Sequence, residues 1–146
     1  MTPAIGNNKD SEKFVLFPIG KRRFALRASV VTELAIPDHL QAFPHTTPLL
    51  SGVLVRRGRI IPVLDIAQVL IGPDAPARKF YLMASRKFAG NAEWTAVPVS
   101  GECELLSAEM IAPTGRLPKY VIGLLSLGDE IVEVLELEKL AAGEAA

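Results

Sequence analysis

The sequence has a single cysteine, only two histidines and no excess of either charge sign. One cysteine, Cys103, excludes an internal disulfide framework and a cysteine-rich zinc site. Sixteen basic and sixteen acidic residues cancel, which argues against bulk binding of nucleic acid, because such binding requires a basic excess. His39 and His45 are six residues apart, with Asp38 as the adjacent acidic residue, and this spacing does not predict a metal site. We therefore expect neither a metal nor a cofactor.

Long apolar runs are also missing. The longest span about five residues, as in 121–125, whereas a helix that crosses a bilayer needs about 20. Residues 1–13 are polar and lack the apolar stretch of a secretory signal. We expect a soluble cytoplasmic protein with no direct insertion into a membrane.

What remains is the composition of a small folded protein. The chain has 146 residues, of which 49% are hydrophobic and 22% charged, so it is globular rather than disordered. This length corresponds to one domain or to two very small subdomains that share a core. Eleven prolines and eleven glycines are spread along the chain, and this distribution favours many short strands and turns over long helices.

Two hairpins can be read directly from the first half of the chain. Residues 13–20 and 24–27 are rich in strand-forming side chains and flank the polar turn 21–23. Residues 52–57 and 59–64 form a second pair of strands around a tight turn at Arg57 and Gly58. A short helix over 66–70 follows the second hairpin.

The second half of the chain repeats the first. Shifting the sequence by 71 residues places Gly52 on Gly123 and Glu33 on Glu104. The first strand aligns best at a shift of 66, with Phe14 on Phe80, which makes the first hairpin of the second half about five residues longer.

This repeat predicts an all-β protein with five strands in each half, each half forming a small barrel. The halves extend over about 13–71 and 79–140, with a joint at 72–78. Residues 1–12 and 141–146 are expected to be loose tails. Whether each strand stays with its own half or is exchanged between the barrels is left open by the sequence.

No catalytic constellation is present. Asp65 and Glu136 occupy equivalent positions in the two repeats, and the repeat explains this pair of carboxylates without catalysis. No serine lies in a nucleophile-elbow context, and Gly20-Lys21 lacks the glycine spacing of a phosphate-binding loop. Cys103 has acidic neighbours that do not lower its pKa, so it is read as a small buried filler. We expect a protein that is not an enzyme.

Two clusters of basic residues are open to more than one interpretation. One comprises residues 21–23 and the other Arg56, Arg57 and Arg59. Either they are solvated hairpin tips or they form a basic patch for an acidic partner, and a barrel that binds nucleic acid is the less favoured alternative, because no aromatic ladder accompanies them. Glu33 lies among strand formers and is a candidate to pair with an arginine such as Arg57.

The ordered series of these segments resembles CheW-like domains. Residues 52–66 are similar to the central signature of that family, a G-V-(apolar)-N-L-R-G-x-(apolar)-(apolar)-P-(apolar)-(apolar)-D-L pattern. The resemblance runs from about Lys13 to Leu140, and it also includes residues 14–20, 24–26, 31–34, 106–113 and 120–129. Val55 and Arg56 depart from the pattern, because they replace its asparagine and leucine.

The resemblance implies two tandem SH3-like five-stranded β-barrels with short helices at the turns. It also implies a non-enzymatic adaptor that couples the cytoplasmic tips of chemoreceptors to the regulatory domain of a CheA-type histidine kinase. A divergent member that serves another chemosensory or motility pathway, and binds only one of these partners, is the alternative. By position, the resemblance implies that partner contact involves Val31, Glu33, Leu34, Val55, Arg56, Arg57 and Gly58.

Overall fold

The computed structural model describes residues 11–36, 40–41, 50–72, 79–88 and 90–145. Their short β-rich segments form strands. Most of these strands are joined by glycine and polar turns, and short helices lie at a few of the connections. The strands are β1 (Ser11–Ile19), β2 (Arg22–Arg27), β3 (Val31–Ala35), β4 (Leu40–Gln41), β5 (Leu50–Arg56), β6 (Arg59–Leu64), β7 (Phe80–Phe88), β8 (Asn91–Val99), β9 (Glu104–Glu109), β10 (Val121–Leu127) and β11 (Glu130–Leu135). The helices are η1 (Ala28–Val30), α2 (Ala67–Leu70) and α3 (Leu137–Ala145).

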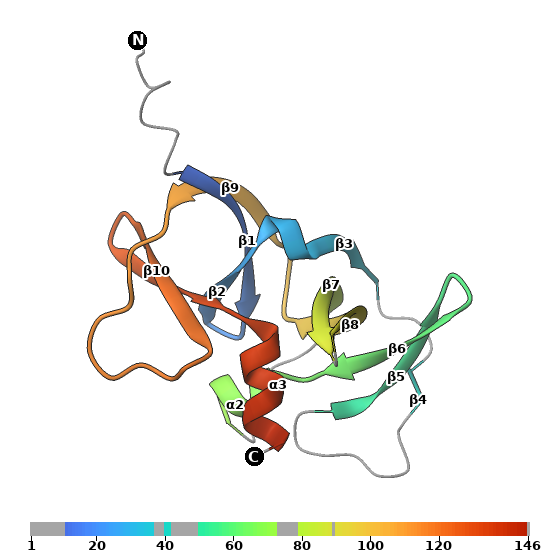
Figure 1. The fold of residues 1–146 in the computed structure, drawn as a ribbon. Coiled ribbons are helices and arrows are strands. Elements are labelled where there is room, and N and C mark those ends of the chain that lie inside the picture. Colours follow the sequence, from blue (N-terminus) through green and yellow to red (C-terminus); the bar gives the residue numbers. More distant parts are fainter. Residues whose placement is uncertain (1–10, 37–39, 42–49, 73–78, 89, 146) are drawn as a thin grey trace.

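The strands form two sheets that lie side by side, with α2 and α3 between them at the bottom of the view (Figure 1). One sheet has five strands in the order β10-β11-β2-β1-β9, and the other has six in the order β3-β7-β8-β6-β5-β4. We call them the five-stranded barrel and the six-stranded barrel. The extra strand is the two-residue β4, so the prediction of five strands per barrel holds except for this short addition.

The first hairpin of each repeat is exchanged between the barrels. β1 and β2, from the first half of the chain, pair with β9 and β11 of the second half. β7 and β8, from the second half, pair with β3 and β6 of the first half. The question that the sequence left open is therefore answered: neither half of the chain contains a complete barrel.

The repeat of 71 residues is present in the structure. β5 and β10 match at this shift residue for residue, as do β6 and β11. The two parallel pairings also match, because Val63 faces Ala96 and Val134 faces Ala25. The β5–β6 and β10–β11 hairpins, which we call the outer hairpins, each carry a shift of strand register at the same place, just before Gly52 and Gly123.

The alignment of the first strand was wrong by one residue. Glu33 faces Met83 and its repeat equivalent Glu104 faces Leu16, so Leu16 corresponds to Met83 at a shift of 67 rather than 66. A shift of one residue turns every side chain of a strand to the opposite face. With 67, Phe14 corresponds to Tyr81, and both are buried inside their barrels. The second-half hairpin is accordingly four residues longer, not five.

Most of the buried hydrophobic side chains of the described residues fall into three clusters. Seven fill the six-stranded barrel and six fill the five-stranded barrel. The largest cluster has sixteen members and draws on both sheets and on α2 and α3. We call it the shared core. Its contributors from the five-stranded barrel include Phe17, Phe24 and Leu26, and those from the six-stranded barrel include Leu64 and Leu82.

The five-stranded barrel is closed by a short contact beyond β9. Ile111 and Leu124 exchange two backbone hydrogen bonds of 2.8 Å, which join the strand edge at β9 to β10. Gly123 permits this approach, because a Cβ at that position would lie 2.3 Å from Cγ of Met110.

The folded part extends slightly beyond the predicted limits. β1 begins at Ser11, and α3 continues to Ala145 with Leu140 buried. None of the helices in the described ranges combines the length and apolarity required to span a bilayer.

Candidate functional site: the open ends of the two barrels

Four side chains form a layer at one open end of the six-stranded barrel. Side chains alternate along a strand, and Ala35, Leu54, Ile61 and Ala96 point into the barrel. Two residues away along the same strands, the next side chains on that face are Glu33, Arg56, Arg59 and Trp94. We call these four residues the first mouth. The interior is apolar, and its rim is charged and aromatic.

Glu33 is held by two arginines from the β5–β6 hairpin. Arg56 donates a hydrogen bond from Nη2 to Oε2 of Glu33 at 2.8 Å, and Nη1 of Arg57 lies 3.5 Å from Oε1. The hydrogen bond from Arg56 and the positive charge of both arginines lower the pKa of the Glu33 carboxyl. The expected pairing of Glu33 with Arg57 is present, but Arg56 makes the shorter contact and is the more buried of the two.

Arg59 lies on the aromatic ring of the same layer. Its guanidinium carbon is 5.4 Å from the centroid of the Trp94 ring, which is a cation–π distance. Within the described residues, no carboxylate lies at ion-pairing distance from Arg59. Together with Glu33, Arg56, Arg57 and Ile61, these two residues line a hollow of about 310 Å³.

The turn between β5 and β6 has the geometry of a two-residue hairpin loop. Arg57 and Gly58 are its central residues, and both have positive φ, +52° and +74°. A type I′ turn requires this sign at both positions. Arg57 is the only residue other than glycine with positive φ among the described residues. At the equivalent position of the second repeat the chain has Gly128, with φ +63°.

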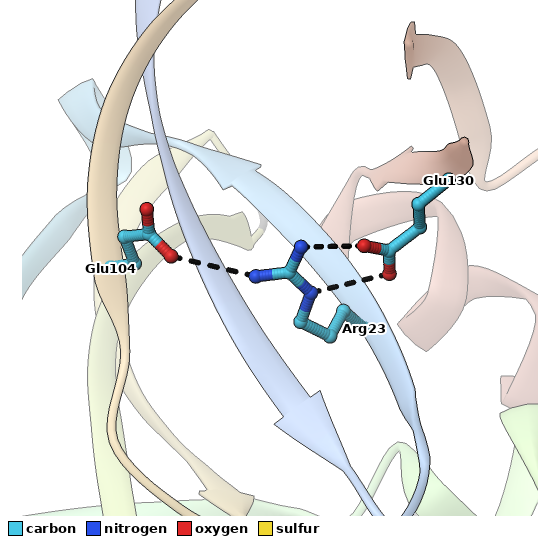
Figure 2. Close-up of polar contacts among 3 residues, drawn as sticks. All are labelled: Arg23, Glu104 and Glu130. Carbon is cyan, nitrogen blue, oxygen red and sulfur yellow. Dashed lines mark hydrogen bonds and ion pairs between the residues drawn. The ribbon is translucent and has the colours of Figure 1, made fainter. Parts of the chain in front are cut away.

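The five-stranded barrel has an equivalent layer with different charges. Shifting the first mouth by 71 residues gives Glu104, Leu127, Glu130 and Arg23, which we call the second mouth. Figure 2 shows Arg23 between the carboxylates of Glu104 and Glu130. Nε of Arg23 donates to Oε2 of Glu130 at 3.2 Å, Nη2 donates to Oε1 of the same carboxylate, and Nη1 lies 3.4 Å from Oε1 of Glu104. These contacts lower the pKa of Glu130 and raise that of Arg23.

The predicted basic turn over residues 21–23 is therefore wrong in part. The turn consists of Gly20 and Lys21, and Arg22 and Arg23 lie in β2. Arg22 stacks 4.7 Å from the centroid of Phe24 and lies 3.6 Å from the Glu133 carboxylate. Because carboxylates accompany both arginines, the cluster is not a basic patch, whereas Lys21 stays exposed in the turn, as the solvated-tip interpretation expects.

Comparison with models of known protein families shows which family the chain belongs to. Residues 13–144 match the CheW-like domain. The chain belongs to the CheW-like domain family. The resemblance stated from the sequence is thus confirmed over most of its length.

Two relatives and one solved structure of the family cover most of this chain. The chemotaxis protein CheW of Klebsiella aerogenes is 25% identical over 144 residues, which include 91% of this chain and 83% of that protein. The probable chemotaxis protein CheW of Rhizobium etli is 26% identical over 142 residues, 91% and 89% of the two chains. The crystal structure of the scaffolding protein TtCheW from Thermoanaerobacter tengcongensis superposes with a TM-score of 0.74 at 19% identity, over 86% of this chain and 88% of that one. This last likeness supports the barrel fold.

The seven predicted contact positions fall into three groups in this chain. Glu33, Arg56 and Arg57 meet at the first mouth, and Gly58 completes the turn beside them. Val55 and Leu34 are exposed. Val31 packs against the shared core.

The predicted contact set did not include Trp94, and it left Arg59 and Arg23 in basic clusters of undecided role. Trp94 is partly buried, packs against the interior of the six-stranded barrel and lies beneath Arg59. The repeat supplied a usable signal, because the shift that relates Glu33 to Glu104 also relates Trp94 to Arg23.

Cys103 lies just before β9 rather than in a strand, and it is partly buried against the shared core. This burial raises the pKa of its thiol to about 11, so the thiol is protonated at neutral pH, as the filler interpretation requires. No group of three or more potential metal ligands occurs among the described residues. His39 and His45 lie outside those residues.

We expect Glu33→Gln to reduce the stability of the domain at neutral pH by up to about 1 kcal/mol, the upper range for a partly exposed ion pair. The folded-state pKa of Glu33 is below the ordinary value of 4.5, so its contribution is present above that value and is lost as the pH falls through the lowered pKa. Thermal melting from pH 7 to pH 3 should show the melting temperatures of wild type and Glu33→Gln converging in acid. Glu109→Gln, at the end of β9, is the control. A difference in melting temperature between wild type and Glu33→Gln that stays constant into acid would contradict a stabilising role for the ionised Glu33 carboxylate.

Proposed function

We propose that this chain is a non-enzymatic adaptor that couples chemoreceptor tips to a CheA-type histidine kinase. The match of residues 13–144 to the CheW-like domain carries the proposal. Two relatives that cover 91% of the chain are named as chemotaxis proteins. The adaptor acts by assembly, because holding receptor and kinase in one geometry allows the conformational bias of the receptor to reach the kinase.

The proposed contact surface is the predicted set of seven residues around the first mouth. The exposed tip of the β5–β6 hairpin supplies the contact residues Val55, Arg57 and Gly58. Arg56 and Glu33 position this tip through their ion pair, and Leu34 extends the surface along β3. Val31 anchors β3 to the shared core and so supports the surface from below.

The conformation of Arg57 supports a role in binding. An L-residue other than glycine, asparagine or aspartate is disfavoured at positive φ by about 1–2 kcal/mol. The repeat uses glycine at the same place, so a less strained residue fits this turn. The strained backbone and the 71% exposed side chain of Arg57 together support a role in contact rather than in stability.

We expect Arg57→Asn to weaken partner binding by about 30-fold, the loss typical of a hot spot of about 2 kcal/mol. Asparagine tolerates positive φ at this turn position, so the melting temperature should stay the same or rise. Binding is measured by titration calorimetry against the regulatory domain of a CheA-type kinase and a chemoreceptor tip from the same organism. Lys21→Asn, which removes a cation from the two-residue turn between β1 and β2, is the matched control. Unchanged affinity for both partners would remove Arg57 from the contact surface.

A further inference from the structure

The tip of the β5–β6 hairpin combines exposed positive charge on Arg57 and Arg59 with exposed apolar surface. Among the described residues that line the hollow, Glu33 is the carboxylate, and it lies beside Arg56, Arg57 and Arg59. Arg56 takes the short contact with Glu33, which leaves Arg57 at 3.5 Å with most of its side chain in solvent. The positive charge at this tip is therefore available to an external partner.

Trp94 holds Arg59 ready for such a partner. A guanidinium stacked on an aromatic face keeps the N–H donors around its edge, where they are free to bind a carboxylate in a bidentate manner. Arg57 and Arg59 line the same hollow. Its volume of about 310 Å³ has room for the side chain of an aspartate or glutamate. The stacking also restricts the rotamers of Arg59 before binding, which reduces the entropy lost on contact.

An apolar pair lies on the outer side of the same hairpin. Val55 and Ile60 face each other across β5 and β6 and are 47% and 73% exposed. Arg59 and Ile60 both line a second hollow, which Glu93 also borders. The carboxylate of Glu93 repels an acidic group from that second hollow, so an incoming carboxylate is directed to the first one.

The second mouth has the opposite character. Arg23 is neutralised by Glu104 and Glu130, and Asp129 occupies the turn position equivalent to Gly58. The two open ends of the molecule therefore differ in charge sign although they share one repeat. A partner selected by charge at the β5–β6 tip would be rejected by the second mouth.

We infer that the β5–β6 tip binds an acidic segment of a protein partner, with a carboxylate between Arg57 and Arg59 and an apolar side chain over Val55 and Ile60. This inference rests on the proposed function for the identity of the partner. A protein surface fits better than a nucleic acid, because the cationic residues are accompanied by an apolar pair and the chain as a whole carries no net charge.

Charge reversal at the tip tests the inference. The probes are the regulatory domain of a CheA-type kinase and a chemoreceptor tip from the same organism, each titrated into wild type, Arg57→Glu and Arg59→Glu. We expect each variant to lose at least about 30-fold in affinity for one of the two partners. Raising sodium chloride from about 50 to about 300 mM should weaken the wild-type complex more than the variant complexes, since screening removes an attraction that the variants lack.

Matched variants separate a local effect from a general one. Arg116→Glu makes the same charge change at an exposed site in the loop between β9 and β10 and should stay within twofold of wild type. Arg59→Gln removes the charge without reversing it, in case Arg59→Glu disturbs Trp94, and it should show an intermediate loss. Melting temperatures of all variants establish that they are folded.

The outcomes distinguish the inference from the proposed function. Wild type that binds neither partner overturns both. Wild type that binds, with affinities and salt dependence unchanged in Arg57→Glu and Arg59→Glu, overturns the inference and leaves the adaptor function intact. A single-stranded oligonucleotide of 20 nucleotides is the third probe, and binding that depends on Arg57 and Arg59 while both proteins bind the variants normally would assign the tip to nucleic acid instead.

Discussion

Residues 1–75 and 76–146, produced as separate chains, are expected to stay unfolded alone and to regain the native fold when mixed. The hairpin exchange is the reason. Separation leaves the β1–β2 hairpin without β9 and β11, and it leaves β7–β8 without β3 and β6. An isolated two-stranded hairpin is marginal at best in water, so the strands of one half have no sheet to join.

The clusters of buried side chains also need both halves of the chain. The interior of the five-stranded barrel combines Phe14, Leu16 and Ala25 with side chains of the second half, and the shared core also draws on both halves. Circular dichroism and the fluorescence of Trp94, the only tryptophan, should show a cooperative melt only after mixing. A contradictory result would be cooperative melting of one half as a monomer. The uncut chain at the same concentration is the control.

Local structure was predictable because it depends on neighbours in the sequence. The β5–β6 hairpin and its turn at Arg57 and Gly58 occur where strand formers flank a glycine. The repeat of 71 residues holds for the outer hairpins without a single shift. Its one error is in the first strand, where identities such as Phe14 with Phe80 outweighed the alternation that actually decides which side chains are buried.

The exchange of hairpins could not be predicted, because the two possible partners of each hairpin carry the same local pattern. β2 and β8 are both suited to lie beside β6 or β11, and the repeat that revealed the barrels also made these choices equivalent. The site shows the same limit. Glu33 was named as a candidate partner of an arginine, but whether Arg56 or Arg57 approaches it more closely depends on a turn conformation that the residue types alone do not fix.

Phe24→Ala is expected to destabilise both barrels together, by about 3–5 kcal/mol, the usual cost of deleting a fully buried phenylalanine. Phe24 belongs to β2 of the five-stranded barrel, is fully buried, and lies in the shared core with its ring centroid 6.2 Å from that of Phe17. The substitution leaves a cavity in the largest cluster of buried side chains. It also removes the aromatic face on which Arg22 stacks.

The position of Trp94 makes this prediction sharp, because its fluorescence reports on the six-stranded barrel alone. If the shared core joins the barrels into one cooperative unit, Phe24→Ala lowers the Trp94 transition and the circular-dichroism transition by the same amount. Leu125→Ala, inside the five-stranded barrel and outside the shared core, should also shift both, by about 2–5 kcal/mol. A Trp94 transition that stays at the wild-type temperature while circular dichroism detects an earlier one would mean that the barrels unfold independently. In that case a bias received by one barrel would have no rigid route to the other, and the adaptor would have to act through contacts on a single barrel.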